Sequence, residues 1–319
     1  MKRVLVIGAG AWGTAIANLI AKNSNEVFLC ANRQLTIDNI NHQSENCEFL
    51  PGVKLSQNVF GVDRFVSDVD FVFIVTPSSG CNKVFEEIAK TKFKKNCIFV
   101  VCSKGLEPKN NLLLSDSFEK VVKNKKYAVL SGPNFAAEVA NEVPSVTTIA
   151  SKNKKLAGLV IKILSNNHFQ AFYFKDPRTA EICGVIKNVI AIGCGMVDGL
   201  DLGVNAKSAL VMKGICEIQL LCKKLKAAID VANPAGFGDI FLTCSSSKSR
   251  NNSLGLLLAQ GLEMEEGKTY EGVTSAKNAV ALAKKLKVKL DLCEAINQIL
   301  IRKSSPEEIK KIISKAILS

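Results

Sequence analysis

The sequence predicts an α/β domain with a mostly parallel, doubly wound sheet in residues 1–180, followed by an all-helical (all-α) domain in residues 181–319. Three observations lead to this prediction. Up to about residue 175, strand-like apolar runs alternate with helix-like segments, which is typical of a parallel sheet with helices on both faces. A glycine-rich turn separates the first strand from the first helix. The rest of the chain shows helical periodicity with few strand signals, so we expect the boundary within residues 176–186.

The expected strands are short runs rich in β-branched and aromatic residues. They lie at residues 4–7, 27–30, 71–75, 98–102, 127–130, 147–150 and 170–173. The helices between them are expected at residues 12–22, 34–43, 80–90, 112–121 and 153–165. In the second half, helices are expected at residues 178–197, 204–228, 252–260, 275–287, 290–301 and 306–318. The last helix has the clearest start, because a serine cap precedes Pro306 and two glutamates.

The glycine-rich turn follows the strand at residues 4–7 and has the spacing G-x-G-x-x-G. Gly8 permits the tight turn, Gly10 lets the main chain approach a pyrophosphate, and Gly13 lets helix and strand pack closely. The N–H groups and the dipole at the helix start would then hold the diphosphate. A glycine turn that binds nothing is the alternative. The strand before the turn and the apolar helix after it favour a Rossmann-type dinucleotide site.

The residues after the second strand bear on which dinucleotide binds. NAD-specific sites usually carry Asp or Glu about 20 residues past the glycines, where it accepts a hydrogen bond from the ribose 2′-hydroxyl. This chain has Ala31-Asn32-Arg33 there, and no carboxylate lies between Val27 and Arg33. Arg33 would pair with the 2′-phosphate of NADP, and the alternative is a solvated loop residue. The sequence therefore permits NADP and does not exclude NAD.

Composition indicates an ordinary globular protein. The chain has 319 residues, of which 47% are hydrophobic and 22% charged, enough for two domains with a large core. No uninterrupted apolar run reaches the roughly 18 residues that span a bilayer, and the nearest, at residues 189–197, carries glycines. The apolar run near the N-terminus is short and leads into the glycine turn rather than a cleavage site. We expect a cytoplasmic protein without membrane insertion.

Charge and cysteine usage narrow the function classes further. A net charge of +13 is compatible with nucleic acid, an acidic surface or phosphorylated small molecules as partners. Only six of the 42 basic residues are arginine, and no basic stripe is interleaved with aromatic residues, so we expect no nucleic-acid binding.

The 11 cysteines form no C-x-x-C pair and there are two histidines, so neither a disulfide framework nor a metal site is expected. The cysteines inside apolar runs are expected to be reduced core thiols.

Lys187 is the strongest candidate for an acid–base group. Reduction of a carbonyl by hydride transfer needs a proton donor near the oxygen. Neither histidine lies in a suitable segment, and no tyrosine has the Tyr-x-x-x-Lys spacing of short-chain reductases. Lys187 is a single charge in an apolar helical segment, where burial and neighbouring cations would lower its pKa from about 10.4. The alternative is an exposed lysine on an amphipathic helix.

The turns at residues 76–78 and 103–105 follow predicted strands and would face a cleft, because ligands of such sheets bind beyond the carboxyl ends of the strands. Lys104 lies in one of them, and a turn lysine in water is the alternative. The turn at residues 132–136 would present backbone N–H groups to a ligand, or would be a plain strand-to-helix connection.

The polar segment at residues 233–252 contains the remaining candidates. Glycines flank Asp239, whose carboxylate could orient Lys187. Arg250 lies among hydroxyl and amide donors, and a phosphate monoester needs a bidentate guanidinium with short hydrogen bonds. A disordered polar loop is the alternative.

Taken together, these segments resemble the bacterial NAD(P)-dependent glycerol-3-phosphate dehydrogenase family nearly from end to end. The matching motifs, in the family's order, are GAGAWGTA at 8–15, LPGVKLSQN at 50–58, SKGLE at 103–107, SGPNFAAEVA at 131–140, GVIKNVIAIG at 184–193, GFGD at 236–239, SRN at 249–251 and YEGV at 270–273. Together they are far more specific than the glycine spacing alone.

The resemblance implies reversible reduction of dihydroxyacetone phosphate to sn-glycerol 3-phosphate with NAD(H) or NADP(H), supplying phospholipid synthesis. By position, Lys187 would be the proton donor, assisted by Lys104 and Asp239, and Arg250 with Asn251 would hold the phosphate. The implied substrate contacts are Lys104, Gly132, Asn134, Lys187, Asn188, Asp239, Thr243, Ser249, Arg250 and Asn251. The implied cofactor contacts are Gly8, Gly10, Ala11, Trp12, Gly13, Arg33, Lys104, Ala136, Arg250, Thr269 and Glu271. The family usually has Ser or Thr where Asn134 stands, so the role of that side chain is open.

Two other functions remain open at the level of sequence. One is a related reductase with a Rossmann and a helical domain that acts on a hydroxy acid of the ketopantoate type. The other is a regulator that binds NAD(P)H without catalysis. The sequence also leaves the choice between NAD and NADP, a homodimeric state and feedback regulation undecided.

Overall fold

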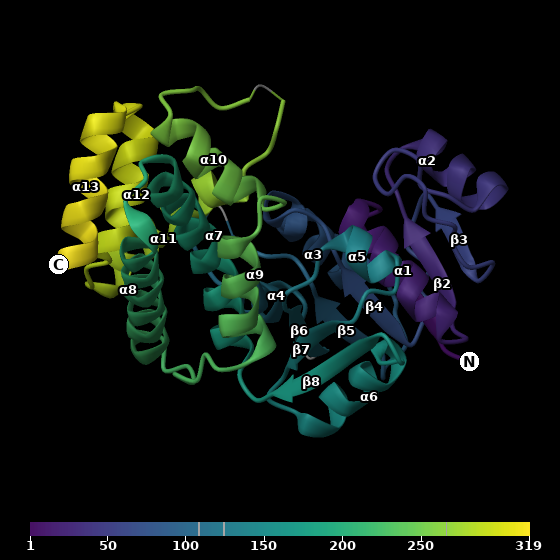
Figure 1. The fold of residues 1–319 in the computed structure, drawn as a ribbon. Helices are drawn as coiled ribbons and strands as arrows, with labels where there is room; N and C mark the ends of the chain where they lie inside the picture. Colours follow the sequence, from purple (N-terminus) through teal and green to yellow (C-terminus); the bar gives the residue numbers. More distant parts are fainter. Residues whose placement is uncertain (108, 124, 266) are drawn as a thin grey trace. The chain divides into compact units, whose positions relative to one another are not determined.

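The computed structural model describes residues 1–107, 109–123, 125–265 and 267–319, and it divides into two compact units (Figure 1). Unit 1 holds Met1–Glu107 and Leu114–Pro177. Unit 2 holds Arg178–Ser319 together with residues 109–113. The division falls between Pro177 and Arg178, slightly before residue 180, and a short earlier segment joins the second unit.

Unit 1 contains an eight-stranded sheet, so the predicted α/β class of this part is confirmed. The strands are β1 Arg3–Ile7, β2 Glu26–Cys30, β3 Val59–Val62, β4 Phe71–Ile74, β5 Ile98–Val101, β6 Lys126–Ser131, β7 Ser145–Ala150 and β8 Phe169–Phe174. The helices are α1 Ala11–Lys22, α2 Gln34–Asp38, α3 Cys81–Lys90, α4 Leu114–Val121, α5 Ala136–Ala140 and α6 Lys154–Leu164.

The sheet has the order β3-β2-β1-β4-β5-β6-β7-β8, and β6 with β7 is the antiparallel pair in an otherwise parallel arrangement. The chain leaves β1 towards β2 on one side and reaches β4 on the other. The carboxyl end of β1 is therefore a topological switch point, the place where sheets of this kind bind ligands. The glycine-rich turn begins there, at Gly8.

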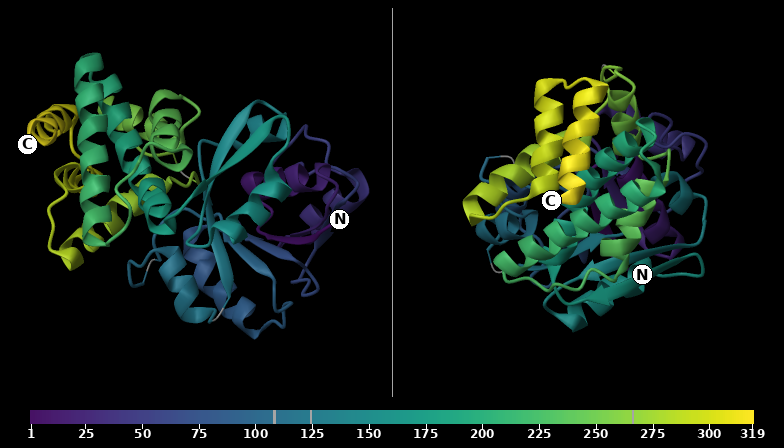
Figure 2. Two further views of the ribbon diagram at one scale, coloured as in Figure 1. Left: turned by 90° about the horizontal axis from the view of Figure 1, so that it is seen from below. Right: turned by 60° about the vertical axis from the view of Figure 1, so that its left-hand side comes forward.

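Helices cover both faces of this sheet, as predicted. Figure 2 shows α3 and α4 on one side of the strands and α1 with α6 on the other. The ring of Phe118 on α4 packs against Phe85 of α3 and Phe99 of β5, with centroid distances of 5.3 and 5.5 Å. Because both faces of the sheet are covered, its strands are buried on both sides, and they appear in the sequence as continuous apolar runs rather than as alternating ones.

The sequence did not predict β3, and it predicted one continuous helix at residues 34–43. The chain instead forms α2 and then a wider π-helical turn, Asn39–Gln43. Gly61 in β3 lies so close to this segment that a Cβ atom there would be 3.1 Å from the carbonyl oxygen of Ile37. The side chain of Asn41 bonds the backbone N–H and C=O of Gly61 at 2.8 and 3.0 Å. Tertiary packing thus stabilises a four-residue strand, although its glycine disfavours strand structure locally.

Unit 2 is helical, which confirms the predicted class of the second half. Its helices are α7 Pro177–Gly199, α8 Gly203–Lys224, α9 Asp239–Ser245, α10 Arg250–Ala259, α11 Glu271–Leu286, α12 Asp291–Arg302 and α13 Pro306–Leu318. A π-helical turn, Pro234–Gly238, precedes α9. The sequence did not predict α9 or this turn, and the disordered loop considered for residues 233–252 is incorrect.

One helix in the described part of the chain, α7, is long and apolar enough to cross a membrane by length and composition. Its apolar window is 100% buried within the protein, as in the core helix of a globular domain. Glycines bring α10 against α7. A Cβ atom on Gly255 would lie 1.9 Å from the carbonyl oxygen of Ile192, and one on Gly195 would lie 1.9 Å from that of Asn252.

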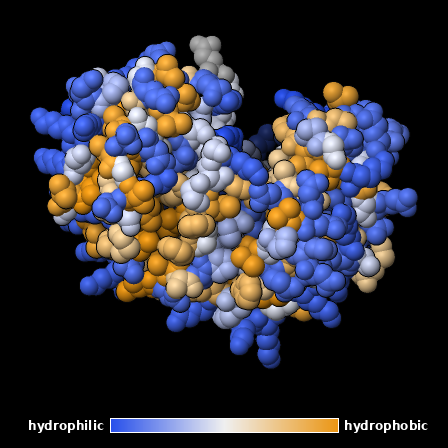
Figure 3. Space-filling view, viewed as in Figure 1, coloured by the Kyte–Doolittle hydropathy of each residue, from blue (hydrophilic) through white to orange (hydrophobic). Residues whose placement is uncertain are grey.

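Exposed apolar side chains occur on unit 2. Figure 3 shows apolar surface around α8 and α9. Met212 of α8, Phe237 of the turn before α9 and Phe241 of α9 are each more than half exposed. The rings of Phe237 and Phe241 stack with their centroids 6.4 Å apart.

Candidate active site

The glycine-rich turn in unit 1 has the geometry that its spacing predicts. Gly8 has a φ of +112°, which favours glycine, and Gly13 packs so tightly that a Cβ atom there would lie 1.8 Å from the carbonyl oxygen of Gly8. A Cβ atom on Gly10 would meet nothing within 4 Å. Gly10 caps α1, whose first residues are Ala11 and the partly buried Trp12. The open side of this turn therefore lies at a helix N-terminus, where backbone N–H groups bind anions.

The end of β2 places Arg33 before α2, where the side chain is 66% exposed. Its guanidinium forms an ion pair with Glu48 and lies 5.9 Å from the centre of the Phe49 ring. Neither Glu48 nor Phe49 was predicted from the sequence as a site residue. Their one sequence signal is that they directly precede the LPGVKLSQN motif at 50–58.

The turns after β4 and β5 interlock in unit 1. The hydroxyl of Ser103 donates to the carbonyl oxygen of Thr76 at 2.5 Å. Gly105 has a φ of +129°, and a Cβ atom there would lie 2.8 Å from Oγ of Ser78. These contacts fix the segment from which Lys104 extends. The Nζ atom of Lys104 donates to the carbonyl oxygen of Gly132 at 3.3 Å.

The turn between β6 and α5 holds Gly132 and Asn134, and Ala136 begins α5. The side-chain amide of Asn134 donates to the carbonyl oxygens of Pro133 at 3.0 Å and Val146 at 2.8 Å. Its Oδ1 atom is buried and accepts no hydrogen bond from the described residues. Buried acceptors are normally paired with a donor, so this oxygen is a costly exception.

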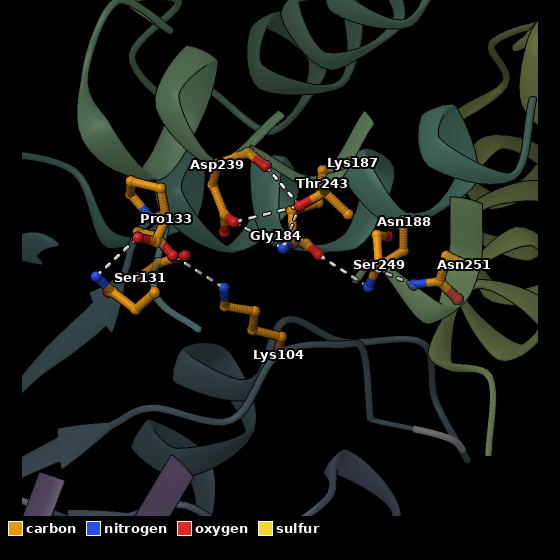
Figure 4. A network of polar contacts seen from close by, with 12 residues as sticks. Lys104, Ser131, Pro133, Gly184, Lys187, Asn188, Asp239, Thr243, Ser249 and Asn251 are labelled. Atoms are coloured by element: carbon orange, nitrogen blue, oxygen red, sulfur yellow. Dashed lines mark hydrogen bonds and ion pairs between the residues drawn. The ribbon is translucent and has the colours of Figure 1, made fainter. Parts of the chain in front are cut away.

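Lys187 lies on α7 in unit 2 and is 8% exposed (Figure 4). Its Nζ atom donates to Oδ1 of Asp239 at 2.7 Å and to Oγ1 of Thr243 at 2.9 Å. The lysine is therefore buried, as predicted, and the exposed alternative is incorrect. The adjacent carboxylate favours the charged ammonium form and opposes the effect of burial. The lowered pKa expected from the sequence rested on burial and neighbouring cations, without this opposing effect of the carboxylate.

Asp239 and Thr243 are held one turn apart on α9. Asp239 is the first residue of that helix and is 1% exposed, and the hydroxyl of Thr243 donates to its backbone carbonyl oxygen at 2.6 Å. Asp239 follows the π-helical turn, in which Gly236 has no room for a side chain, because a Cβ atom would lie 2.2 Å from the carbonyl oxygen of Val231. This close approach explains the glycine at position 236.

A second polar group surrounds Asn188, one residue after Lys187 on α7. The amide of Asn251 on α10 donates to Oδ1 of Asn188 at 3.0 Å. Oδ1 of Asn251 in turn accepts the backbone N–H of Gly272 on α11 at 2.9 Å. Three helices are thus joined by buried amides next to the buried lysine.

The remaining candidates of unit 2 lie at helix starts. Ser249 caps α10 by accepting the backbone N–H of Asn252 at 3.3 Å, and Arg250 is the exposed first residue of that helix. Thr269 is exposed in the segment before α11, and Glu271 is the exposed first residue of α11. The helix dipole repels a cation at the N-terminus of a helix. The same cation and the free N–H groups together attract a bound anion.

The cysteines near Lys187 are not acid–base candidates. A hydrogen bond with Cys194 and burial raise the pKa of the Cys244 thiol, and burial raises that of Cys183. These thiols therefore remain protonated at neutral pH. Within the described ranges, no group of three or more His, Cys, Asp or Glu side chains could hold a metal ion.

A glycine turn at the switch point of a parallel sheet, together with a helical unit that holds a buried lysine–aspartate pair, defines a two-domain, dinucleotide-binding class of protein. A family model described as the N-terminus of NAD-dependent glycerol-3-phosphate dehydrogenase matches residues 3–157, and the model of its C-terminus matches residues 176–311. The chain belongs to the NAD-dependent glycerol-3-phosphate dehydrogenase family.

Relatives and a solved structure agree with this family. The chain is 37% identical to "Glycerol-3-phosphate dehydrogenase [NAD(P)+]" of Bacillus velezensis, with 94% of this chain and 90% of the relative covered. It is 38% identical to the protein of that name from Caulobacter vibrioides, with 94% and 92% covered. The crystal structure of glycerol-3-phosphate dehydrogenase from Coxiella burnetii is similar with a TM-score of 0.91 and 28% identity, over 98% of each chain.

Proposed function

We propose that this chain catalyses the reversible, NAD(P)H-dependent reduction of dihydroxyacetone phosphate to sn-glycerol 3-phosphate, with Lys187 as the proton donor. The product would feed phospholipid synthesis. Family membership supports the reaction and the nicotinamide cofactor. The buried contact of Lys187 with Asp239 and Thr243 supports the role of the lysine.

The glycine turn of unit 1 fits a dinucleotide. Gly10 leaves open space beside the N-terminus of α1, where a diphosphate can accept backbone N–H hydrogen bonds. When bound, the reduced nicotinamide supplies a hydride to the carbonyl carbon of the substrate. We propose Gly8, Gly10, Ala11, Trp12, Gly13, Arg33, Lys104, Ala136, Arg250, Thr269 and Glu271 as cofactor contacts.

Lys187 is suited to hold a proton at the substrate oxygen. Asp239 and Thr243 fix the position of its ammonium group, and a carboxylate next to an amine favours the charged form. A fixed positive charge stabilises a developing alkoxide, and the same group can donate its proton to that oxygen. In the reverse direction, the neutral lysine would accept the proton of the alcohol.

Arg250, with Asn251 and Ser249, is proposed to hold the phosphate. Arg250 extends from the start of α10, where helix dipole and guanidinium favour the same anion. Asn188 and Thr243 complete the proposed substrate contacts of unit 2. In unit 1 we propose Lys104, Gly132 and Asn134 as substrate contacts. Among the residues that the structure describes, none donates to Oδ1 of Asn134. We propose that a substrate hydroxyl donates to it, a contact that serine or threonine would make through its own hydroxyl.

The function is tested by following NADH and NADPH absorbance side by side with dihydroxyacetone phosphate. We expect absorbance to fall with this substrate, and to fall far more slowly with ketopantoate or with phosphate-free dihydroxyacetone. Preference for ketopantoate would favour the hydroxy-acid reductase. Cofactor binding without any absorbance loss would favour the non-catalytic regulator.

We further propose that the enzyme works in the cytoplasm, without inserting into a membrane, and as a homodimer. The exposed, stacked rings of Phe237 and Phe241 support an association surface on unit 2. Light scattering coupled to size exclusion tests the dimer, and a mass of one chain across concentrations would contradict it.

A further inference from the structure

We propose that Glu48 sets a preference of this chain for NADH over NADPH. The inference depends on the dinucleotide site of the proposed function and names the residue that selects between the two cofactors. Both the acid and the arginine involved lie in unit 1, beside the glycine turn.

The chain lacks the acidic residue that usually marks an NAD site. In such sites, an Asp or Glu at the end of the second strand accepts a hydrogen bond from the ribose 2′-hydroxyl. Here β2 ends at Cys30, and Ala31, Asn32 and Arg33 follow. From the sequence alone, Arg33 therefore favours a 2′-phosphate.

The structure supplies a carboxylate at this position from a later segment. Glu48 forms an ion pair with Nη1 of Arg33, and the hydroxyl of Thr36 donates to its second carboxylate oxygen at 3.5 Å. The Glu48 side chain is 34% exposed, so a ligand can reach it. Phe49 is 40% exposed beside the Arg33 guanidinium and offers an apolar surface to an adenine ring.

Asn46 fixes this acidic segment against the glycine turn. It is 1% exposed, and its amide donates to the carbonyl oxygen of Ala9 at 2.9 Å and to Oγ1 of Thr14 at 2.8 Å. Its own backbone carbonyl oxygen accepts the N–H of Leu50 at 2.9 Å. Ala9 lies inside the glycine turn, so Glu48 is tied to the edge of the sheet where the diphosphate would bind.

The consequence is electrostatic. A 2′-phosphate would have to compete with Glu48 for Arg33 and would lie near its negative charge. A ribose 2′-hydroxyl instead donates a hydrogen bond to that carboxylate, and such charge-assisted bonds are strong. Glu48 therefore favours NADH and disfavours NADPH, although Arg33 alone would favour NADPH.

The test is direct binding of NADH and NADPH to the full chain, measured by fluorescence titration, for the unaltered protein and for Glu48→Gln. Because an exposed ion pair contributes little to stability, this variant should fold. We expect the unaltered chain to bind NADH more tightly. In Glu48→Gln the ratio of the NADPH to the NADH dissociation constant should fall by about tenfold or more.

Two further variants make the result specific. Glu86→Gln removes an exposed carboxylate on α3 and should leave the ratio unchanged. Adding Arg33→Gln to Glu48→Gln should remove the gain in NADPH affinity. Tighter binding of NADPH than of NADH by the unaltered chain would overturn this inference but not the proposed function. The same holds if Glu48→Gln leaves the ratio of the two dissociation constants unchanged. Binding of neither cofactor by the unaltered chain would overturn the proposed function and this inference with it.

Discussion

At the scale of single residues, the proposed chemistry depends on the buried ion pair of Lys187 and Asp239. Taking two charges out of water is costly, and a buried pair is often no more stable than an apolar substitute. The second hydrogen bond of Lys187, to Thr243, offsets part of that cost. A charge kept in the protein interior without a gain in stability is typical of a functional site.

Arg250 is predicted to act through the substrate phosphate. We expect Arg250→Ala to raise KM for dihydroxyacetone phosphate by about tenfold or more, because a charge-assisted contact is lost. At saturating NADH, which removes any effect of the proposed cofactor contact of Arg250, the variant should change activity towards phosphate-free dihydroxyacetone far less. Initial-rate kinetics with both substrates provide the measurement.

Arg302→Ala is the matched control, because Arg302 is an exposed arginine at the end of α12. It should leave both KM values unchanged. If Arg250→Ala left KM for the phosphorylated substrate unchanged as well, the assignment of Arg250 to the phosphate would be wrong.

At the scale of elements, close helix packing determines where the polar residues of unit 2 lie. The approach of α10 to α7 depends on glycines, because an added Cβ atom on Gly255 would overlap the backbone of α7. This approach brings Asn251 within hydrogen-bond distance of Asn188.

Gly255→Ala should therefore lower the free energy of unfolding by about 1–3 kcal/mol or more. Gly158→Ala on α6 is the control, since an added Cβ atom there would meet nothing within 4 Å. In a helix this control should raise the free energy of unfolding by about 0.5–1 kcal/mol. Urea denaturation of both variants distinguishes the two effects, and a Gly255→Ala variant as stable as the parent would contradict the packing argument.

The contact between α8 and α12 predicts a pH effect. Glu217 of α8 accepts the backbone N–H groups of Leu292 and Cys293 at 2.6 and 3.2 Å, while burial raises its pKa above the ordinary 4.5. The folded state therefore binds this proton more tightly than the unfolded state. Stability contributed by Glu217 should fall as pH rises from about 4.5 and level off above the raised pKa.

Glu217→Gln isolates this effect, because glutamine does not titrate. The free energy of unfolding of the parent, minus that of the variant, should decrease with rising pH in denaturation experiments. A difference that stayed constant or increased with pH would show that burial does not raise the pKa of Glu217.

At the scale of the whole molecule, the sequence was sufficient to predict those features that have a repeating pattern or a fixed residue spacing. The apolar strands, the long helices and the glycine turn could be predicted because each has a local pattern with a direct physical cause. The family resemblance followed from motifs spread over both halves of the chain.

Features that depend on tertiary contacts could not be predicted. β3 forms because Gly61 packs against the 34–43 segment, and α9 starts after a turn whose geometry local propensity does not encode. The pairing of Arg33 with Glu48 joins residues from two segments, so the search for an acid at the end of the second strand missed it.

The most direct test is the rate of NADH oxidation with dihydroxyacetone phosphate by Lys187→Ala. Removing a general acid lowers kcat by about 10²-fold or more, and we expect that loss with NADH binding retained. Lys187→Ala leaves the Asp239 carboxylate buried without its cation, which can destabilise the fold. The double variant Lys187→Met with Asp239→Asn removes both charges and serves as the folding check. Lys284→Ala, which removes an exposed lysine on α11, is the control. A kcat of Lys187→Ala close to that of the parent would contradict the account.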